Sequence, residues 1–414
     1  VEEVGEEEVG EDEAIEEEVV EDEAVEEEVV EDVVGDGVKF PVGTLQGVVG
    51  RAQAYFWPSN SDLMHLNMGI VGDLGTGKTQ LLKMLVAQLK RQADAKQPNP
   101  ISVLILDYKG DFLGVRDDFL NAVGGRLLEP RGIPLTPIGL QDVNDRQERA
   151  KKKADFIDVL TKIDSGVGAV QVHHIRETLD DVWDNVGPSP TMEQVAQRYF
   201  ANVNQEPDTV YSLLETFTDA EVFSTDPNEF ITFEELMHES LVVLNLHAIG
   251  QDDRLKNSLV ALFLNHYYEY MLNLRRWDFQ GDDPELRRLN SFLVIDEAKN
   301  IMPKKFRALG TILREGRDFG VGVVLASQYL NDFKTTGANA ENYAEPLRTW
   351  FIHNVPNVTQ RQLSDRGLPD ATNEDADEIK RLAKHHSYYK SLDYEGKIIR
   401  NIPFFELLEE SADG

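Results

Sequence analysis

One glycine-rich stretch constrains the fold of this chain more than any other feature. Residues 72–79 fit the pattern G-x-x-x-x-G-K-[ST], and glycines at 72, 75 and 77 let consecutive backbone N–H groups turn toward one point. A short apolar run, residues 66–71, precedes the stretch, and residues 80–90 carry apolar side chains at helical spacing. Strand, loop and helix together predict a phosphate-binding loop. Without them, the same string would be a chance glycine turn.

The predicted loop assigns roles to its residues. A bound phosphate would face the loop N–H groups and the positive end of the following helix. Lys78 would reach the β- and γ-phosphates of a nucleotide, and the Thr79 hydroxyl would ligate Mg²⁺. The expected nucleotide-binding residues are Gly72, Asp73, Leu74, Gly75, Thr76, Gly77, Lys78, Thr79 and Gln80.

Composition narrows the class of protein. The 414 residues contain no cysteine, which excludes disulfide and thiolate chemistry. No apolar run approaches the roughly 18 residues of a membrane span, and the acidic N-terminus lacks the basic region of a signal peptide. We therefore expect a cytoplasmic protein that does not enter a membrane.

The negative charge is concentrated at the start of the chain. Residues 1–37 contain 20 acidic and no basic residues, which leaves −14 of the net charge of −34 for the remainder. This segment repeats with a period near ten residues, and its apolar residues match neither a helix nor a strand. We predict a disordered acidic tail or linker; a DNA mimic or a lure for a basic partner is the alternative.

The remaining chain alternates apolar runs with helical patterns, as an α/β protein with a mainly parallel sheet does. Residues 38–112 and 239–414 are expected to form the two parts of this core. Residues 113–238 lack a repeated strand signal and are expected to form a mostly helical insertion. The three lysines at 151–153 could contact a phosphate backbone or cover a solvated helix face.

Two further strands are expected to end on candidate site residues. Residues 291–295 are apolar and lead to Asp296 and Glu297, the Walker B pattern. Asp296 is suited to support Mg²⁺, and Glu297 to activate the attacking water. Residues 321–326 lead to Gln328, which can contact a γ-phosphate or be a satisfied strand-end amide. Asp107, at the end of the strand predicted over 101–106, and Asp111 are also site candidates.

Arg314 and Arg317 are candidate arginine fingers. Such a residue neutralises charge that develops on a transferred phosphoryl group. If a neighbouring subunit supplied it, hydrolysis would depend on assembly. A surface arginine in an ion pair is the alternative.

Four stretches together resemble the HerA/FtsK superfamily of P-loop motors. They are the glycine loop at 72–79, Leu-Asp-Tyr-Lys-Gly-Asp-Phe at 106–112, Leu-Val-Ile-Asp-Glu-Ala at 293–298, and residues 313–328. In the last, Arg-Glu-Gly-Arg precedes an aromatic residue, a glycine, an apolar strand and Ser-Gln. The chain is also similar to the C-terminal ATPase part of the DptH (DndH) proteins, a restriction component of phosphorothioation-linked DNA defence.

The resemblance implies a RecA-like core, a ring that is usually hexameric, and ATP-driven movement on duplex DNA. By position it implies that Lys78 and Thr79 bind phosphate and Mg²⁺ and that Asp296 supports Mg²⁺. Glu297 is then the catalytic base and Gln328 the sensor, and Arg317 matches the finger better than Arg314.

We therefore expect a multimeric DNA translocase or helicase-type motor that uses ATP and Mg²⁺, with defence-system proteins as further partners. Two alternatives stay open. One is a nucleotide-dependent switch or scaffold in a defence complex, without translocation. The other is a small-molecule or nucleoside kinase, against which the water-activating Glu297 argues.

Overall fold

The computed structural model describes residues 37–47, 52–97, 99–113, 118–238, 240–276, 286–336, 340–392 and 394–412. The predicted disordered acidic segment, residues 1–37, lies outside these ranges except for Gly37. None of the described helices is both long and apolar enough to cross a membrane.

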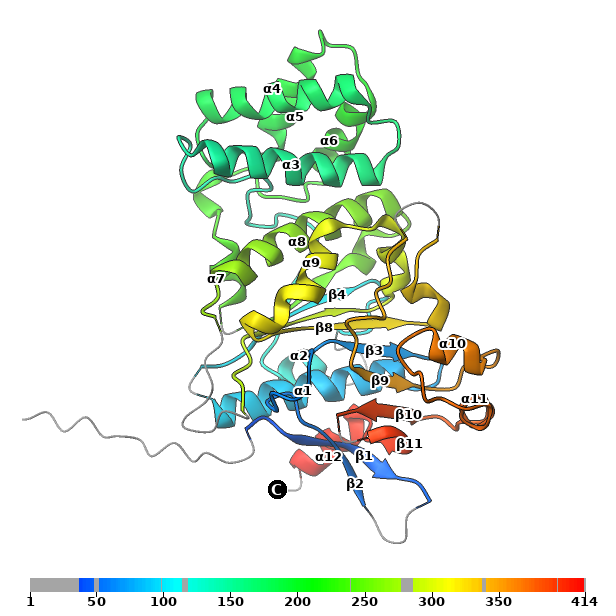
Figure 1. Ribbon diagram of the computed structural model, residues 1–414. Helices are drawn as coiled ribbons and strands as arrows, with labels where there is room; N and C mark the ends of the chain where they lie inside the picture. Colours follow the sequence, from blue (N-terminus) through cyan, green and yellow to red (C-terminus); the bar gives the residue numbers. More distant parts are fainter. Residues whose placement is uncertain are drawn as a thin grey trace, which may run out of the picture. The chain divides into compact units, whose positions relative to one another are not determined.

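A single mixed sheet organises the described chain (Figure 1). Its parallel part comprises, in spatial order, β9 (Thr349–Ile352), β3 (Met68–Val71), β8 (Val321–Ser327), β7 (Ser291–Ile295), β4 (Ser102–Asp107), β6 (Leu241–Asn245) and β5 (Arg126–Leu128). An antiparallel part extends it beyond β9 with β10 (His386–Ser391), β11 (Tyr394–Asn401), β1 (Phe40–Leu45) and β2 (Gln53–Phe56). The predicted α/β class with a mainly parallel sheet is confirmed.

The parallel strands are buried on both faces. Along β4, Val103 and Ile105 enter one hydrophobic core, whereas Leu104 and Leu106 enter the other, because successive side chains of a strand point to opposite sides. Helices must therefore cover both faces. α1 (Lys78–Lys96) and α12 (Phe404–Ala412) cover one face, and α8 (Asp253–Asn273) and α9 (Arg307–Glu315) cover the other (Figure 1).

A helical bundle lies beyond α8 (Figure 1). It comprises α3 (Arg146–Ile163), α4 (Ala169–Asn185), α5 (Met192–Asn202) and α6 (Thr209–Asp219). Side-chain caps start α3, α5 and α6; the Asp145 carboxylate, for example, accepts hydrogen bonds from the N–H groups of Gln147 and Glu148 at the start of α3. Shorter helices elsewhere are α2 (Phe119–Ala122), α7 (Phe233–Met237), α10 (Gln360–Ser364) and α11 (Asn373–Ile379).

Two local features differ from the sequence-based expectation. β5 lies within the range expected to be mostly helical, and its three residues were too few to give a strand pattern. The closing hairpin is present, but its expected turn residues, Glu395 and Gly396, lie inside β11, so that the chain reverses before Tyr394. The antiparallel part also joins segments far apart in sequence, since Thr44 pairs with Arg400.

Candidate functional site

The glycine loop connects β3 to α1. Gly75 and Gly77 have φ angles of 74° and 107°, in the left-handed region that favours glycine. Gly72 allows a close approach instead, because a Cβ there would lie 2.6 Å from the Cβ of His353. Leu74, at the tip of the loop, is exposed. The glycines therefore leave the loop backbone accessible at the positions where a phosphate would contact it.

Lys78 folds back over this loop. Its ammonium group donates hydrogen bonds to the carbonyl oxygens of Gly72 and Asp73, the second at 2.9 Å. Burial lowers the pKa of Lys78 and the charge of Lys109 lowers it further, while the nearby carboxylate of Glu297 opposes both effects. The lysine thus lies within the electrostatic field of the Walker B residues, as the predicted site requires.

Three oxygen-bearing side chains gather beside Lys78. The Thr79 hydroxyl donates to Asp111 Oδ2 at 3.1 Å. Asp296 is buried, and its Oδ2 has no hydrogen-bond partner among the described residues. Burial raises the pKa of Asp296 to about 7, against the opposing charge of Lys109. A buried carboxylate oxygen without a partner, near a hydroxyl and a second carboxylate, fits Mg²⁺, which prefers oxygen ligands.

Glu297 follows β7 in the left-handed backbone region, with φ of 58°. The Lys109 ammonium pairs with one of its carboxylate oxygens, and Lys299 reaches the other at 3.1 Å. The Gln328 amide nitrogen lies 3.4 Å from Glu297 Oε1. Burial alone would raise the pKa of Glu297, but Lys109 and Lys299 outweigh it and hold the pKa below its ordinary value. The carboxylate is therefore ionised, the form that can accept a proton.

Asp107 organises a turn rather than facing the site. Its two carboxylate oxygens accept four backbone hydrogen bonds, at 2.8 to 3.2 Å, from the N–H groups of residues 109–112. Burial raises the pKa of this carboxyl group, and those hydrogen bonds oppose the rise. The turn carries Lys109 and Asp111 into the site from the strand next to β7.

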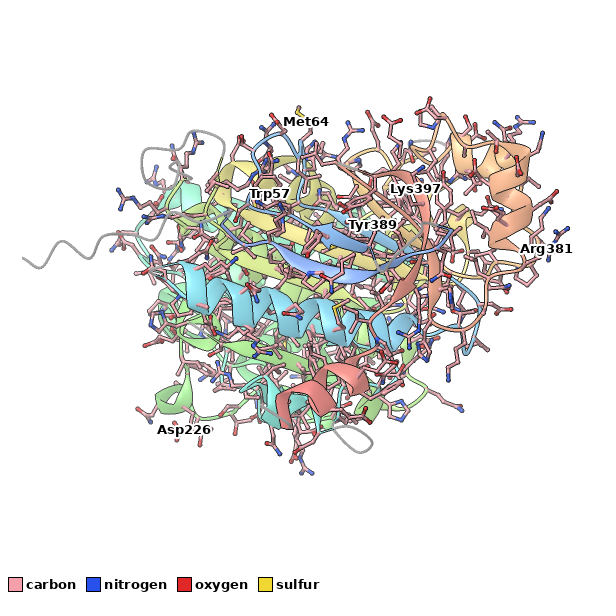
Figure 2. All side chains as sticks on the ribbon, turned by 90° about the horizontal axis from the view of Figure 1, so that it is seen from below. Trp57, Met64, Asp226, Arg381, Tyr389 and Lys397 are labelled. Carbon is pink, nitrogen blue, oxygen red and sulfur yellow. The ribbon has the colours of Figure 1, made fainter. Side chains whose placement is uncertain are left out.

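The two candidate arginine fingers lie far from these carboxylates within one subunit. Arg314 is in the last turn of α9 and Arg317 precedes β8, whereas Gln328 follows the opposite end of β8. A strand of seven residues at roughly 3.3 Å per residue spans about 20 Å. The guanidinium of Arg317 lies 3.9 Å from the sulfur of Met64, which projects from the edge of the molecule in Figure 2.

The three lysines at 151–153 pair with two carboxylates. Lys151 and Lys152 both pair with Glu269 on α8, and Lys153 pairs with Asp180 on α4. The pairs with Glu269 join the helical bundle to α8, and the pair with Asp180 lies within the bundle; the two carboxylates offset part of the positive charge of the three lysines. Lys151 stays exposed, so a phosphate-backbone contact and a solvated helix face both remain predictions for this cluster.

Three residues of this region were not assigned a role from sequence. Lys109 contacts Glu297, His353 packs against Gly72, and the His385 N–H donates to the Thr76 carbonyl at 2.9 Å. Lys109 follows the end of β4 by two residues, at the edge of the sheet where site residues gather. Its position in the sequence could therefore have indicated a role in the site. His353 and His385 come from segments that only the tertiary fold brings to the loop.

Known proteins share sequence or fold with this chain. Residues 167–388 match the protein family described as the type IV secretion-system coupling protein DNA-binding domain. A search of the curated proteins found no match.

Solved structures share the fold at low sequence identity. VirB4 of Thermoanaerobacter pseudethanolicus is 13% identical, with a TM-score of 0.66 over 89% of this chain and 97% of that one. The bacterial conjugative coupling protein TrwB, in an unbound form, is 14% identical, with a TM-score of 0.52 over 83% and 86%. TrwB has also been solved with ADP and Mg²⁺, at a TM-score of 0.51, 14% identity and the same coverage. These likenesses confirm the predicted RecA-like P-loop fold.

Proposed function

Because the chain belongs to the type IV secretion-system coupling protein DNA-binding domain family, we propose that it is an ATP-driven motor that moves duplex DNA. The predicted resemblance to P-loop ATPases is confirmed at the level of the HerA/FtsK superfamily. The narrower resemblance to DptH, the defence partners and the cytoplasmic location stay predictions. One observation carries the proposal: Lys78, Thr79, Asp296, Glu297 and Gln328 converge at the carboxyl-terminal edge of neighbouring parallel strands.

The geometry supports a division of roles. The loop N–H groups and Lys78 bind the phosphates of ATP, and Thr79 and Asp296 hold Mg²⁺. Glu297 accepts the proton of the attacking water, and Gln328, which touches Glu297, couples that carboxylate to the end of β8. MgATP supplies the phosphoanhydride bond that the reaction cleaves.

The distance between the two arginines and the P-loop favours a nucleotide site that two subunits share. A finger at one end of β8 can serve a P-loop at the other end only in a second subunit. We therefore propose a ring, hexameric as in the resemblance, in which Arg317 or Arg314 of one subunit faces the nucleotide of the next. Duplex DNA is the proposed partner of the assembled ring.

A second function has one observation in its favour. The positive charge of the lysines at 151–153 is partly offset by Glu269 and Asp180, and the chain beyond residue 37 is acidic. A nucleotide-dependent switch that gates a partner, without translocation, would need no DNA-binding surface.

The test is the ATPase rate with and without linear duplex DNA, at several protein concentrations. A motor with a shared site should show turnover that rises with DNA and climbs more steeply than the protein concentration. Lys78→Ala is the control for contaminating ATPase activity. An ATPase rate per subunit that depends on neither DNA nor protein concentration would contradict the motor and favour the nucleotide-dependent switch.

A further inference from the structure

The nucleotide site has a side that the catalytic residues do not occupy. Its carboxylates and Gln328 come from β8, β7 and β4, which all lie on one side of β3. A nucleotide with its γ-phosphate toward those residues must direct its nucleoside toward the other side of β3. That side is formed by β9, β10 and the segments next to them.

Two aromatic side chains lie on this nucleoside side. The ring of His385 stands against the loop, since a Cβ on Gly77 would lie 2.6 Å from its Nδ1. The rings of Phe405, on α12, and His385 meet in an edge-to-face arrangement, with centroids 5.8 Å apart and an interplanar angle of 74°. The Phe405 side chain is 41% exposed, although its neighbour Phe404 is buried in the core.

Backbone contacts fix both rings relative to the loop. His385 has φ of 61°, in the left-handed region that residues other than glycine adopt uncommonly. Its N–H donates to Thr76 and its carbonyl accepts from Asn401, at 2.9 and 2.8 Å, and these bonds hold it there. The Phe405 N–H donates to Gln80 Oε1 at 3.3 Å, while α12 runs alongside α1 (Figure 2).

We propose that the exposed ring of Phe405, with His385 packed against it, forms a stacking platform for the nucleobase, and that this platform favours purine over pyrimidine nucleotides. The inference rests on the proposed nucleotide site and specifies how that site binds the base. Stacking on an aromatic face accepts any base, and a purine covers more of the face than a pyrimidine does. ATP and GTP should therefore bind with similar affinity, and CTP and UTP more weakly.

The first test measures nucleotide affinity by isothermal titration calorimetry, in the full chain and without reference to turnover. Phe405→Ala should weaken ATP binding by roughly 5- to 150-fold, the range expected for the loss of one stacked base. The same variant should bind inorganic tripolyphosphate as the unmodified chain does. Glu409→Ala, an exposed change on the same helix, is the matched control and should leave both affinities unchanged.

A second variant reports the contact directly. In Phe405→Trp, ATP should quench the added tryptophan emission, whereas inorganic tripolyphosphate should not. Equal losses of affinity for ATP and tripolyphosphate in Phe405→Ala, or no quenching by ATP in Phe405→Trp, would overturn the platform. If the unmodified chain bound no ATP, or bound it as well after Lys78→Ala, the proposed nucleotide site itself would be wrong.

Discussion

The ammonium group of Lys109 is paired with the carboxylate of Glu297, across the boundary between β4 and β7. Lys109 stands on the turn that Asp107 ties down with four hydrogen bonds, and Glu297 is held in the left-handed backbone region. The proposed catalytic base is thus oriented by a residue from a different strand. Its position depends on the sheet rather than on the Walker B segment alone.

Lys109→Met removes this orienting contact, so we expect kcat for ATP hydrolysis to fall by roughly 10- to 100-fold with little change in ATP affinity. Steady-state kinetics and calorimetry separate the two effects. Lys299→Met is the matched control, because Lys299 pairs with the same carboxylate and is about equally exposed, but it lowers the pKa of Glu297 less than Lys109 does. A loss in Lys299→Met as large as that in Lys109→Met would contradict the special role of Lys109.

Two substitutions separate binding from hydrolysis. Lys78→Ala removes the ammonium from the phosphate loop and should abolish measurable ATP binding. Glu297→Gln keeps the size of the side chain but not its basicity, so ATP should still bind while kcat drops by roughly 10²- to 10⁴-fold. Calorimetry and phosphate release measure the two quantities. Near-normal turnover in Glu297→Gln would disprove the base assignment.

Arg317→Ala tests whether the site is shared between subunits. The variant should bind ATP but hydrolyse it slowly, because the finger would be missing from every neighbouring P-loop. When it is mixed with unmodified subunits, activity should fall below the average of the two, as measured across a series of ratios. Arg314→Ala in parallel identifies which arginine acts. Activity equal to the average of the two proteins would indicate that the arginine finger acts within its own subunit, or that neither arginine acts as a finger.

Asp107→Asn should destabilise the protein although it changes only one atom. The amide NH₂ group cannot accept a hydrogen bond, so at least one buried N–H of the turn loses its partner, at a cost of roughly 1–3 kcal/mol in unfolding free energy. Urea unfolding measures this. The control is Asp226→Asn, which alters a similar turn at an exposed position (Figure 2) and should change stability by less than about 0.5 kcal/mol.

His266 should make the fold sensitive to acid. Its ring is half-buried with Nε2 enclosed, and it stacks on Phe233 with centroids 5.6 Å apart; desolvation of the ring lowers its pKa from 6.5 to about 4. The unfolded chain therefore binds the extra proton more readily, so stability falls as the pH drops below about 6.5, and the loss is complete below about 4. The whole difference corresponds to roughly 3 kcal/mol.

Urea midpoints between about pH 7 and pH 4 measure this loss, and His266→Phe should reduce it. His173→Phe, at an exposed position on α4, should leave the pH dependence as it was. An unchanged slope in His266→Phe would show that other groups cause the acid sensitivity.

Local patterns were sufficient to predict the strand, loop and helix around Lys78 and the strands that end at Asp296 and Gln328. Each is a continuous segment whose residue order already encodes its geometry. The pairing of Lys109 with Glu297 was not predictable, because it joins segments nearly 190 residues apart through the neighbouring positions of β4 and β7. His385 was missed for the same reason, since no local pattern indicates which loop will meet the P-loop.

The sheet also gives the described chain an unbroken path for mechanical load. β1, near one end of the described residues, is hydrogen-bonded to β11, and from there the ladder passes through β10 and β9 to β3, the strand that carries the phosphate loop. Tension applied at Phe40 would therefore be transmitted sideways through strand pairs to the nucleotide site, instead of being absorbed by a loose connection. The proposed motor would need its loaded segment and its nucleotide site in one stiff frame, and this strand ladder provides such a frame.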